Sequence, residues 1–272
     1  MASPDWQQIL GVRFFNGAAP DAVDYITRVG GYTVVPAAPA LVTIENDPAY
    51  CRALVEADLA IADSGFMVLL WRVLRGRTIA RISGLKYLRI LLANPRLHER
   101  GSIFLVLPHQ SSREKALVWL GKEDFEITAD DCYIAPKYFS CSHGSVSREE
   151  RERVSQRRGY SIADDALVAI LQSHKPKHVI IGIGGGVQEK VGFYLREHLS
   201  YRPAIHCIGA ALAFLTGDQK PIPMWADRIY LGWFLRLARA PHHYARRFSS
   251  AFRLPGMIWR YGSELPPLKI TK

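Results

Sequence analysis

The stretch VIIGIGGGVQEK, residues 179–190, decides the fold. It opens with three β-branched apolar residues, which favour a buried strand. Glycines follow at 182, 184, 185 and 186, and the polar run Gln188-Glu189-Lys190 comes directly after Val187. Glycine lets the backbone turn sharply and lets its N–H groups approach a phosphate, and the start of a helix adds partial positive charge. The stretch therefore predicts a strand, a turn that approaches a ligand, and a helix.

Similar strand and helix patterns alternate along the chain up to about residue 216. The segments predicted as strands are 32–35, 57–62, 102–107, 125–129, 178–183 and 204–209. The segments predicted as helices are 48–56, 66–75, 84–93, 112–120, 161–173 and 188–199. This alternation, with strands apolar on both faces, is typical of an α/β protein whose mostly parallel sheet is covered by helices on both sides. We predict a doubly wound, Rossmann-like fold.

Charge divides the chain into two parts. The net charge is +10, and residues 220–272 contribute ten Lys and Arg against two acidic residues, which is +8. We predict an α/β core at 1–217 and a basic, aromatic-rich helical appendage at 218–272. The sequence has no run of about 18 apolar residues and no basic start followed by an apolar stretch, so we expect neither a transmembrane helix nor a secretory signal.

Polar side chains follow the predicted strand 57–62. Ligands of open parallel sheets bind beyond the carboxyl ends of the strands, and Asp63-Ser64-Gly65 lies at such an end. Asp63 is either a cap for the next helix or a general base that takes a proton from a hydroxyl group. Arg81 is either a counter-charge for a diphosphate or an ordinary surface residue.

The glycine turn Gly184-Gly185-Gly186 lies at a second strand end. Its spacing fails the dinucleotide pattern GxGxxG at Val187, and no Lys-Ser/Thr pair completes a Walker A loop. The turn is thus a bare connection or a phosphate site, and Gln188 and Glu189 on the first helical turn favour the phosphate site.

Metal and cofactor chemistry finds little support in the sequence. The four cysteines form no CxxC pair, and Cys141 and His143 lack further ligands at zinc-like spacing, so we expect neither a metal site nor a cofactor. The histidines at 174, 178 and 206 are expected to be ordinary residues at strand edges.

Together these segments resemble the WecG/TagA/CpsF family of bacterial glycosyltransferases over nearly the whole chain. The similar segments are LGVRFF (10–15), DPAYCRALVEADLAIADSG (47–65), RISG (81–84), APKYF (135–139), GIGGGVQEK (182–190), GAALAFLTG (209–217) and YLGWFLRLARAPHHYARRF (230–248). They stand in the family's order.

The resemblance implies an inverting, metal-independent transfer of a sugar from a UDP-sugar to a lipid-diphosphate-linked acceptor sugar, at the cytoplasmic face of the cell membrane. It implies Asp63 as the catalytic base. The donor diphosphate would lie against Arg81, Gly184, Gly185, Gly186, Gln188 and Glu189. Acceptor and membrane contacts would come from Arg236, Arg239, Arg246 and Arg247 of the appendage.

Several family positions carry other residues here. The donor-binding T-x-N motif falls on Val35-Pro36-Ala37, so both polar side chains are replaced. Further polar positions of the family are occupied by Lys86, Ala213, Pro221 and Gly232. The resemblance implies a UDP-sugar donor that is N-acetylmannosamine-like or a related hexose or uronic acid, and these replacements leave open which of them this chain uses. A non-catalytic nucleotide-sugar-binding homologue is the main alternative; an NAD-dependent oxidoreductase comes third, because the GxGxxG pattern fails.

The appendage has three interpretations: a membrane-surface element, a helical cap, or a nucleic-acid face. Aromatic residues among arginines suit the headgroup region of an anionic membrane, so the first is favoured. Nucleic-acid binding is disfavoured because the core is nearly neutral. We expect a peripheral protein on the inner face of the membrane, and the sequence leaves a homo-oligomer open.

Overall fold

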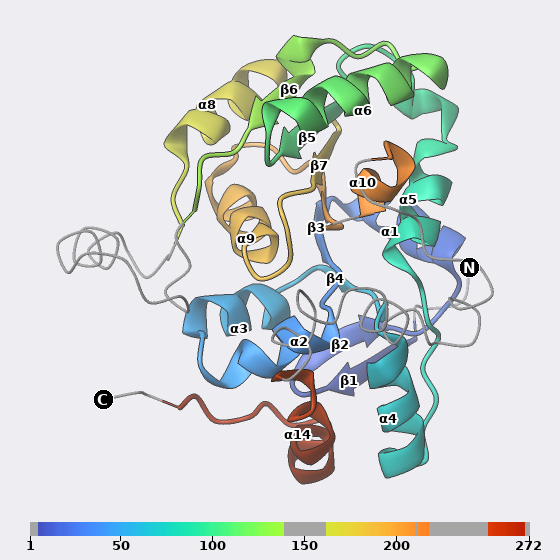
Figure 1. Cartoon of the computed structure of the whole chain (residues 1–272), viewed down its shortest axis with the longest axis vertical. Coiled ribbons are helices and arrows are strands. Elements are labelled where there is room, and N and C mark those ends of the chain that lie inside the picture. The colour runs from blue at the N-terminus through green and yellow to red at the C-terminus, as the bar shows by residue number, and fades with distance from the viewer. Residues whose placement is uncertain (1–4, 139–161, 210, 218–249, 270–272) are drawn as a thin grey trace, which may run out of the picture.

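The computed structural model describes residues 5–138, 162–209, 211–217 and 250–269, and in this part of the chain one sheet runs through the molecule (Figure 1). Its eight strands lie in the order β1-β2-β4-β3-β8-β7-β5-β6. The β1–β2 pair is antiparallel and the other pairs are parallel. The predicted α/β class with a mostly parallel sheet is confirmed.

The strands are β1 Trp6–Ile9, β2 Val12–Phe15, β3 Gly31–Val34, β4 Leu59–Ala60, β5 Ile103–Leu107, β6 Cys132–Ile134, β7 His178–Ile181 and β8 Ala204–Cys207. The helices are α1 Ala19–Val29, α2 Ala38–Leu41, α3 Pro48–Val55, α4 Gly65–Arg75, α5 Gly84–Leu92, α6 Gln110–Lys122, α8 Asp165–His174, α9 Gln188–His198, α10 Ala211–Leu215 and α14 Leu254–Tyr261. Short 3-10 turns are η1 Val42–Glu45, η2 Pro95–Leu97 and η3 Ala129–Asp131.

The sheet has an apolar layer on each face. Alternate strand residues enter opposite layers: in β5, Phe104 and Val106 join the layer under α3, α8 and α9, whereas Leu105 joins the layer under α1, α5 and α6. Figure 1 shows these two helix groups on the two sides of the sheet. Burial on both faces explains why the strands are apolar throughout and not alternating in polarity.

The chain leaves the carboxyl ends of β3 and β8 toward opposite faces. After β3 it enters α2 and α3 on one face, and after β8 it enters α10, which packs against α5 on the other. The two strands are neighbours in the sheet. Such a switch point leaves a crevice between adjacent strand ends, where open α/β sheets bind ligands.

One predicted strand is wrong, and three strands, β1, β2 and β6, lie outside the predicted strand segments. Segment 125–129 is not a strand: Phe125 stacks on His98, and Thr128 and Asp131 form a capping box around η3, so the edge strand begins only at Cys132. The β1–β2 hairpin turns through Leu10 and Gly11, both at positive φ.

A chain of buried polar side chains crosses the layer beneath α5. Thr33 Oγ1 lies 3.3 Å from Tyr87 Oη, which lies 2.8 Å from His206 Nδ1, and His206 Nε2 lies 3.1 Å from His178 Nδ1. His206 therefore lies inside the sheet and not at its edge, contrary to the expectation for this histidine. Burial lowers the pKa of both imidazoles, to about 4 for His178.

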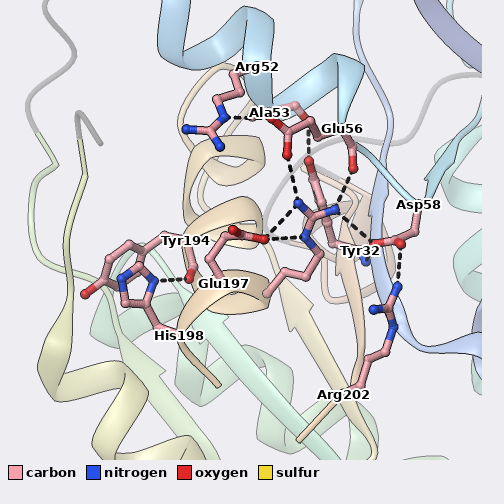
Figure 2. Close-up of polar contacts among 10 residues, drawn as sticks. Tyr32, Arg52, Ala53, Glu56, Asp58, Tyr194, Glu197, His198 and Arg202 are labelled. Atoms are coloured by element: carbon pink, nitrogen blue, oxygen red, sulfur yellow. Dashed lines mark hydrogen bonds and ion pairs between the residues drawn. The ribbon is translucent and has the colours of Figure 1, made fainter. Parts of the chain in front are cut away.

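A network of charges joins elements at the amino edge of the sheet (Figure 2). Arg196 of α9 donates to the Glu56 carbonyl at 2.8 Å and contacts the carboxylates of Glu56 and Glu197 at 3.1 and 2.9 Å. Arg202 and the Tyr32 N–H both bind Asp58, at 2.6 and 3.0 Å. The network fastens α3, α9 and the starts of β3 and β4 to one another, on the edge opposite the crevice.

The segment 250–269 returns to the core. Arg75 of α4 donates to the Ile258 and Trp259 carbonyls of α14 at 2.9 Å, and the Leu10 N–H donates to Gly262 O at 2.9 Å. Arg253 and Lys269 both contact the buried Glu45 carboxylate, at 2.8 and 2.6 Å. No helix in the described residues has the length and hydrophobicity needed to cross a membrane.

Candidate active site

Asp63 lies at the carboxyl end of β4, half-buried beside the crevice. Its Oδ1 accepts a hydrogen bond from Gly84 N, 3.1 Å away, at the first position of α5. The next helix, α4, is capped by Ser64 instead, whose Oγ accepts from Met67 N at 3.3 Å. Asp63 is thus not the cap of its own helix; its carboxylate faces the positive end of another.

Arg81 lies next to Asp63 in space. Its Nε donates to the Asp63 carbonyl oxygen at 2.8 Å, and Ile82 N donates to Ala62 O at 3.1 Å. These bonds hold the chain after β4 against the segment that leads into α5. Arg81 therefore helps to fix the position of Asp63.

The glycine turn follows β7 and is held from inside by Glu189. Gly184 and Gly186 have φ values of 112° and 91°, which other residues rarely adopt. The Gly186 N–H donates to Glu189 Oε2 at 2.7 Å, so this N–H is occupied. Glu189 is fully buried, and burial raises the pKa of its carboxyl to about 7.

Gln188 begins α9 and is 1% exposed. Its Nε2 donates to Cys207 O at 3.1 Å and to Glu189 Oε1 at 3.3 Å. Its Oε1 has no hydrogen-bond partner among the described residues, although it is buried. A buried acceptor without a donor is costly, so this oxygen is a candidate for a ligand or water contact.

The predicted residues lie along one continuous edge. Gly84, bound to Asp63, is close-packed: a methyl group placed on it would lie 3.8 Å from Ile208 O, at the end of β8. One placed on the adjacent Gly209 would lie 3.4 Å from Gln188 Nε2. The structure thereby links Asp63, the β8 end and the glycine turn across the crevice.

Sequence reasoning did not find the polar contacts behind the turn. Lys190, 4% exposed, pairs with Asp47 at the N-cap of α3, at 3.0 Å. Tyr50 is fully buried and its hydroxyl has no partner among the described residues. The sequence feature that could have indicated these contacts is the run of three polar residues, 188–190, at the start of a helix that packs against the sheet.

The end of β3 contributes apolar surface. Val35 is 9% exposed, Pro36 is buried, and Val35 Cγ1 lies 3.6 Å from a methyl group placed on Gly84. The replaced T-x-N motif therefore lies at the switch point, beside Asp63.

Two expectations, the appendage arginines and the lack of a metal site, concern residues that the structure describes only in part or not at all. Arg236, Arg239, Arg246 and Arg247 all lie outside them. Within the described ranges, no group of three His, Cys, Asp or Glu side chains is placed to hold a metal ion.

The fold and this edge define an α/β protein with an open, mostly parallel sheet and polar side chains near the carboxyl ends of its central strands. The chain belongs to the glycosyl transferase WecG/TagA/CpsF family, whose family model matches residues 7–268. A search of curated proteins found no match. The chain is thus, by family, a glycosyltransferase of cell-surface polysaccharide biosynthesis, a family that uses a nucleotide-sugar donor and a lipid-linked acceptor.

Proposed function

We propose that this glycosyltransferase moves a sugar from a UDP-sugar, with inversion and without a metal, to a polyprenyl-diphosphate-linked acceptor at the inner face of the cell membrane. The supporting observation is the continuous edge that joins Asp63, Gly84 and the glycine turn. A carboxylate and a glycine-rich helix start near the carboxyl ends of neighbouring strands support a site of this kind.

Asp63 is the proposed catalytic base. A carboxylate at this position can accept the proton of an acceptor hydroxyl as the hydroxyl oxygen attacks the sugar carbon and the bond to UDP breaks. The Gly84 N–H and the start of α5 suit the negatively charged form of the side chain.

The donor diphosphate would lie over Gly184 and Gly185, with Arg81 as a counter-charge. Gln188 Oε1, which has no partner among the residues that the structure describes, would accept a hydrogen bond from an N–H or O–H group of the donor. Such fixed groups can offset the charge that develops on departing UDP. Because Val35 and Ala37 replace polar family residues, we expect the donor sugar to present an apolar face to them.

Replacing Asp63 with Asn tests the proposed base. The amide oxygen can still accept from Gly84 N–H, so UDP binding measured by calorimetry should be unchanged, while UDP release in the presence of a lipid-linked acceptor should fall by about 10²–10⁴-fold. Asp21→Asn, at an exposed position of α1, is the control. Unchanged turnover in Asp63→Asn would reduce Asp63 to a helix-capping residue.

A non-catalytic nucleotide-sugar-binding homologue is the second candidate. The apolar residues at the end of β3 favour it, because they remove two side chains with which the family binds its donor. UDP binding by the unmodified protein, with no sugar transfer to any lipid-linked acceptor tested, would select this candidate.

The membrane proposal has support in two adjacent helices, α4 of the core and α14 of the described C-terminal segment. On α4, Leu69 and Val73 lie one turn apart, and Val73 is 78% exposed; on the adjacent α14, Trp259 is 71% exposed. Neither helix contains an acidic residue, and Arg72 and Arg260 are exposed. Exposed apolar and basic side chains together suit an anionic lipid surface.

A further inference from the structure

The buried Glu189 carboxylate is surrounded by hydrogen-bond donors. Gly186 N–H reaches Oε2 at 2.7 Å and Gln188 Nε2 reaches Oε1 at 3.3 Å. The orientation of the Gln188 amide is fixed by a third group, because Nε2 also donates to Cys207 O at 3.1 Å. Rotating the amide would set two oxygens against each other.

This arrangement fits a carboxylate and not a carboxylic acid. In the ionised form each oxygen accepts one of these bonds, whereas an acid carries its proton on one oxygen, which is then a poorer acceptor. Protonation of either oxygen also removes the negative charge that strengthens both hydrogen bonds. Burial has the opposite effect, since it favours the neutral acid.

We propose that Glu189 is a positioning residue whose ionised carboxylate holds the glycine turn and the Gln188 amide in the shape that receives the donor, and whose protonation weakens the hold on both. The proposal rests on the proposed function only for the identity of the ligand. The pKa of Glu189, about 7, places the change near neutral pH.

The other groups that face Glu189 do not replace it as the titrating group. From α3, Tyr50 faces it, and from β8, Cys207; burial and the Glu189 charge raise the pKa of both well above their ordinary values, so they stay neutral. From α9 itself, Lys190 adds a positive charge that is paired with Asp47 at 3.0 Å.

Amide hydrogen exchange of the free protein tests the turn without any ligand. If only the protonated form exposes the Gly186 N–H, its NMR-measured protection, corrected for the intrinsic rate at each pH, should fall about tenfold from pH 8 to pH 6. Glu189→Gln should show low protection at both pH values. Glu197→Gln, on the exposed face of the same helix, should retain the wild-type profile.

Measurements of donor binding test whether the protonation of Glu189 also weakens the affinity for the donor. UDP-N-acetylglucosamine is the probe, because its doubly esterified diphosphate carries no titrating proton between pH 6 and 8. Its dissociation constant should rise about tenfold from pH 8 to pH 6 in the wild type and stay flat in Glu189→Gln.

The outcomes separate the two proposals. Protection of Gly186 that is equal at pH 6 and pH 8 in the wild type would overturn the role of Glu189, and this measurement holds even if Glu189→Gln does not fold. Protection that follows pH, with no UDP-N-acetylglucosamine or UDP binding at any pH, would support the role of Glu189 in the turn and overturn the UDP-sugar donor.

Discussion

At the residue scale, the chemical types of the candidate site could be predicted, but not their partners. Asp63 and the glycine turn stand out in the sequence because each follows an apolar strand. The partner of Asp63, Gly84, is 21 residues away and only the packing of α5 brings it near. Glu189 looked like a ligand-facing side chain, yet it is buried beneath the turn, because Tyr50 and Cys207 from distant elements cover it.

Histidine burial predicts how stability depends on pH. His178 has a folded-state pKa of about 4, below its ordinary 6.5, so the unfolded chain takes up a proton that the folded chain refuses. The contribution of His178 to stability is therefore present above about pH 6.5 and is lost as pH falls toward 4.

Replacing His178 with Asn should remove this contribution. The difference in the free energy of unfolding between wild type and His178→Asn should narrow as pH falls from 7 to 4, measured by urea denaturation. His174→Asn, at an exposed position at the end of α8, should leave the wild-type slope unchanged. A difference that stays constant over this range would contradict the assigned cause.

At the element scale, sequence patterns were enough to predict those helices and strands whose form depends mainly on their own residues. The core strands β5, β7 and β8 and the helices α3 to α6 were predicted because apolar runs and helical periodicity are local properties. The β1–β2 hairpin was not, because its Leu10-Gly11 turn lacks the usual Asn-Gly signal. Its turn is held instead by bonds to Gly262 and Ser263, at the far end of the chain.

The packing of α9 on the sheet depends on a glycine. A Cβ on Gly192 would lie 2.5 Å from Cys207 Sγ and 3.4 Å from Tyr32 Cδ2. Any larger residue at this position would therefore push α9 away from β8. Because α9 carries Gln188 and Glu189 at its start, a displaced helix would also move the glycine turn.

Gly192→Ala should destabilise the protein by about 1–3 kcal/mol, because overpacking outweighs the roughly 1 kcal/mol gain in helix propensity. Chemical denaturation measures the change, and Cys207→Ala in the same chain should recover part of it by removing the sulfur. Gly121→Ala in α6, where an added Cβ meets nothing within 4 Å, should be neutral or stabilising. Equal effects at the two glycines would refute the packing argument.

At the scale of the whole molecule, the described C-terminal segment is fastened to the core at several places. Leu254 and Ile258 are fully buried, and Glu45 would lose its two cations without Arg253 and Lys269. A buried carboxylate without a counter-charge is destabilising. Experiments on the appendage should therefore keep residues 250–269 and change surface side chains.

The exposed side chains of α4 and α14 allow such a test of membrane binding. Val73 and Trp259 are mostly exposed, so changing both to Asp should leave the fold intact. Removing two inserted apolar groups, at roughly 1.5 kcal/mol or more each, should weaken co-sedimentation with anionic liposomes by at least about tenfold.

Val118 provides the matched control for this experiment. It is 61% exposed on α6, at the other end of the molecule from α14 (Figure 1), so Val118→Asp adds the same charge as either single change, Val73→Asp or Trp259→Asp, to a surface that we expect to face water. Binding by the wild type should also weaken as salt is raised, because Arg72 and Arg260 act through screened electrostatics. Equal loss in Val118→Asp and in the Val73→Asp/Trp259→Asp double variant would mean that added negative charge, and not this helix pair, controls binding to the liposomes.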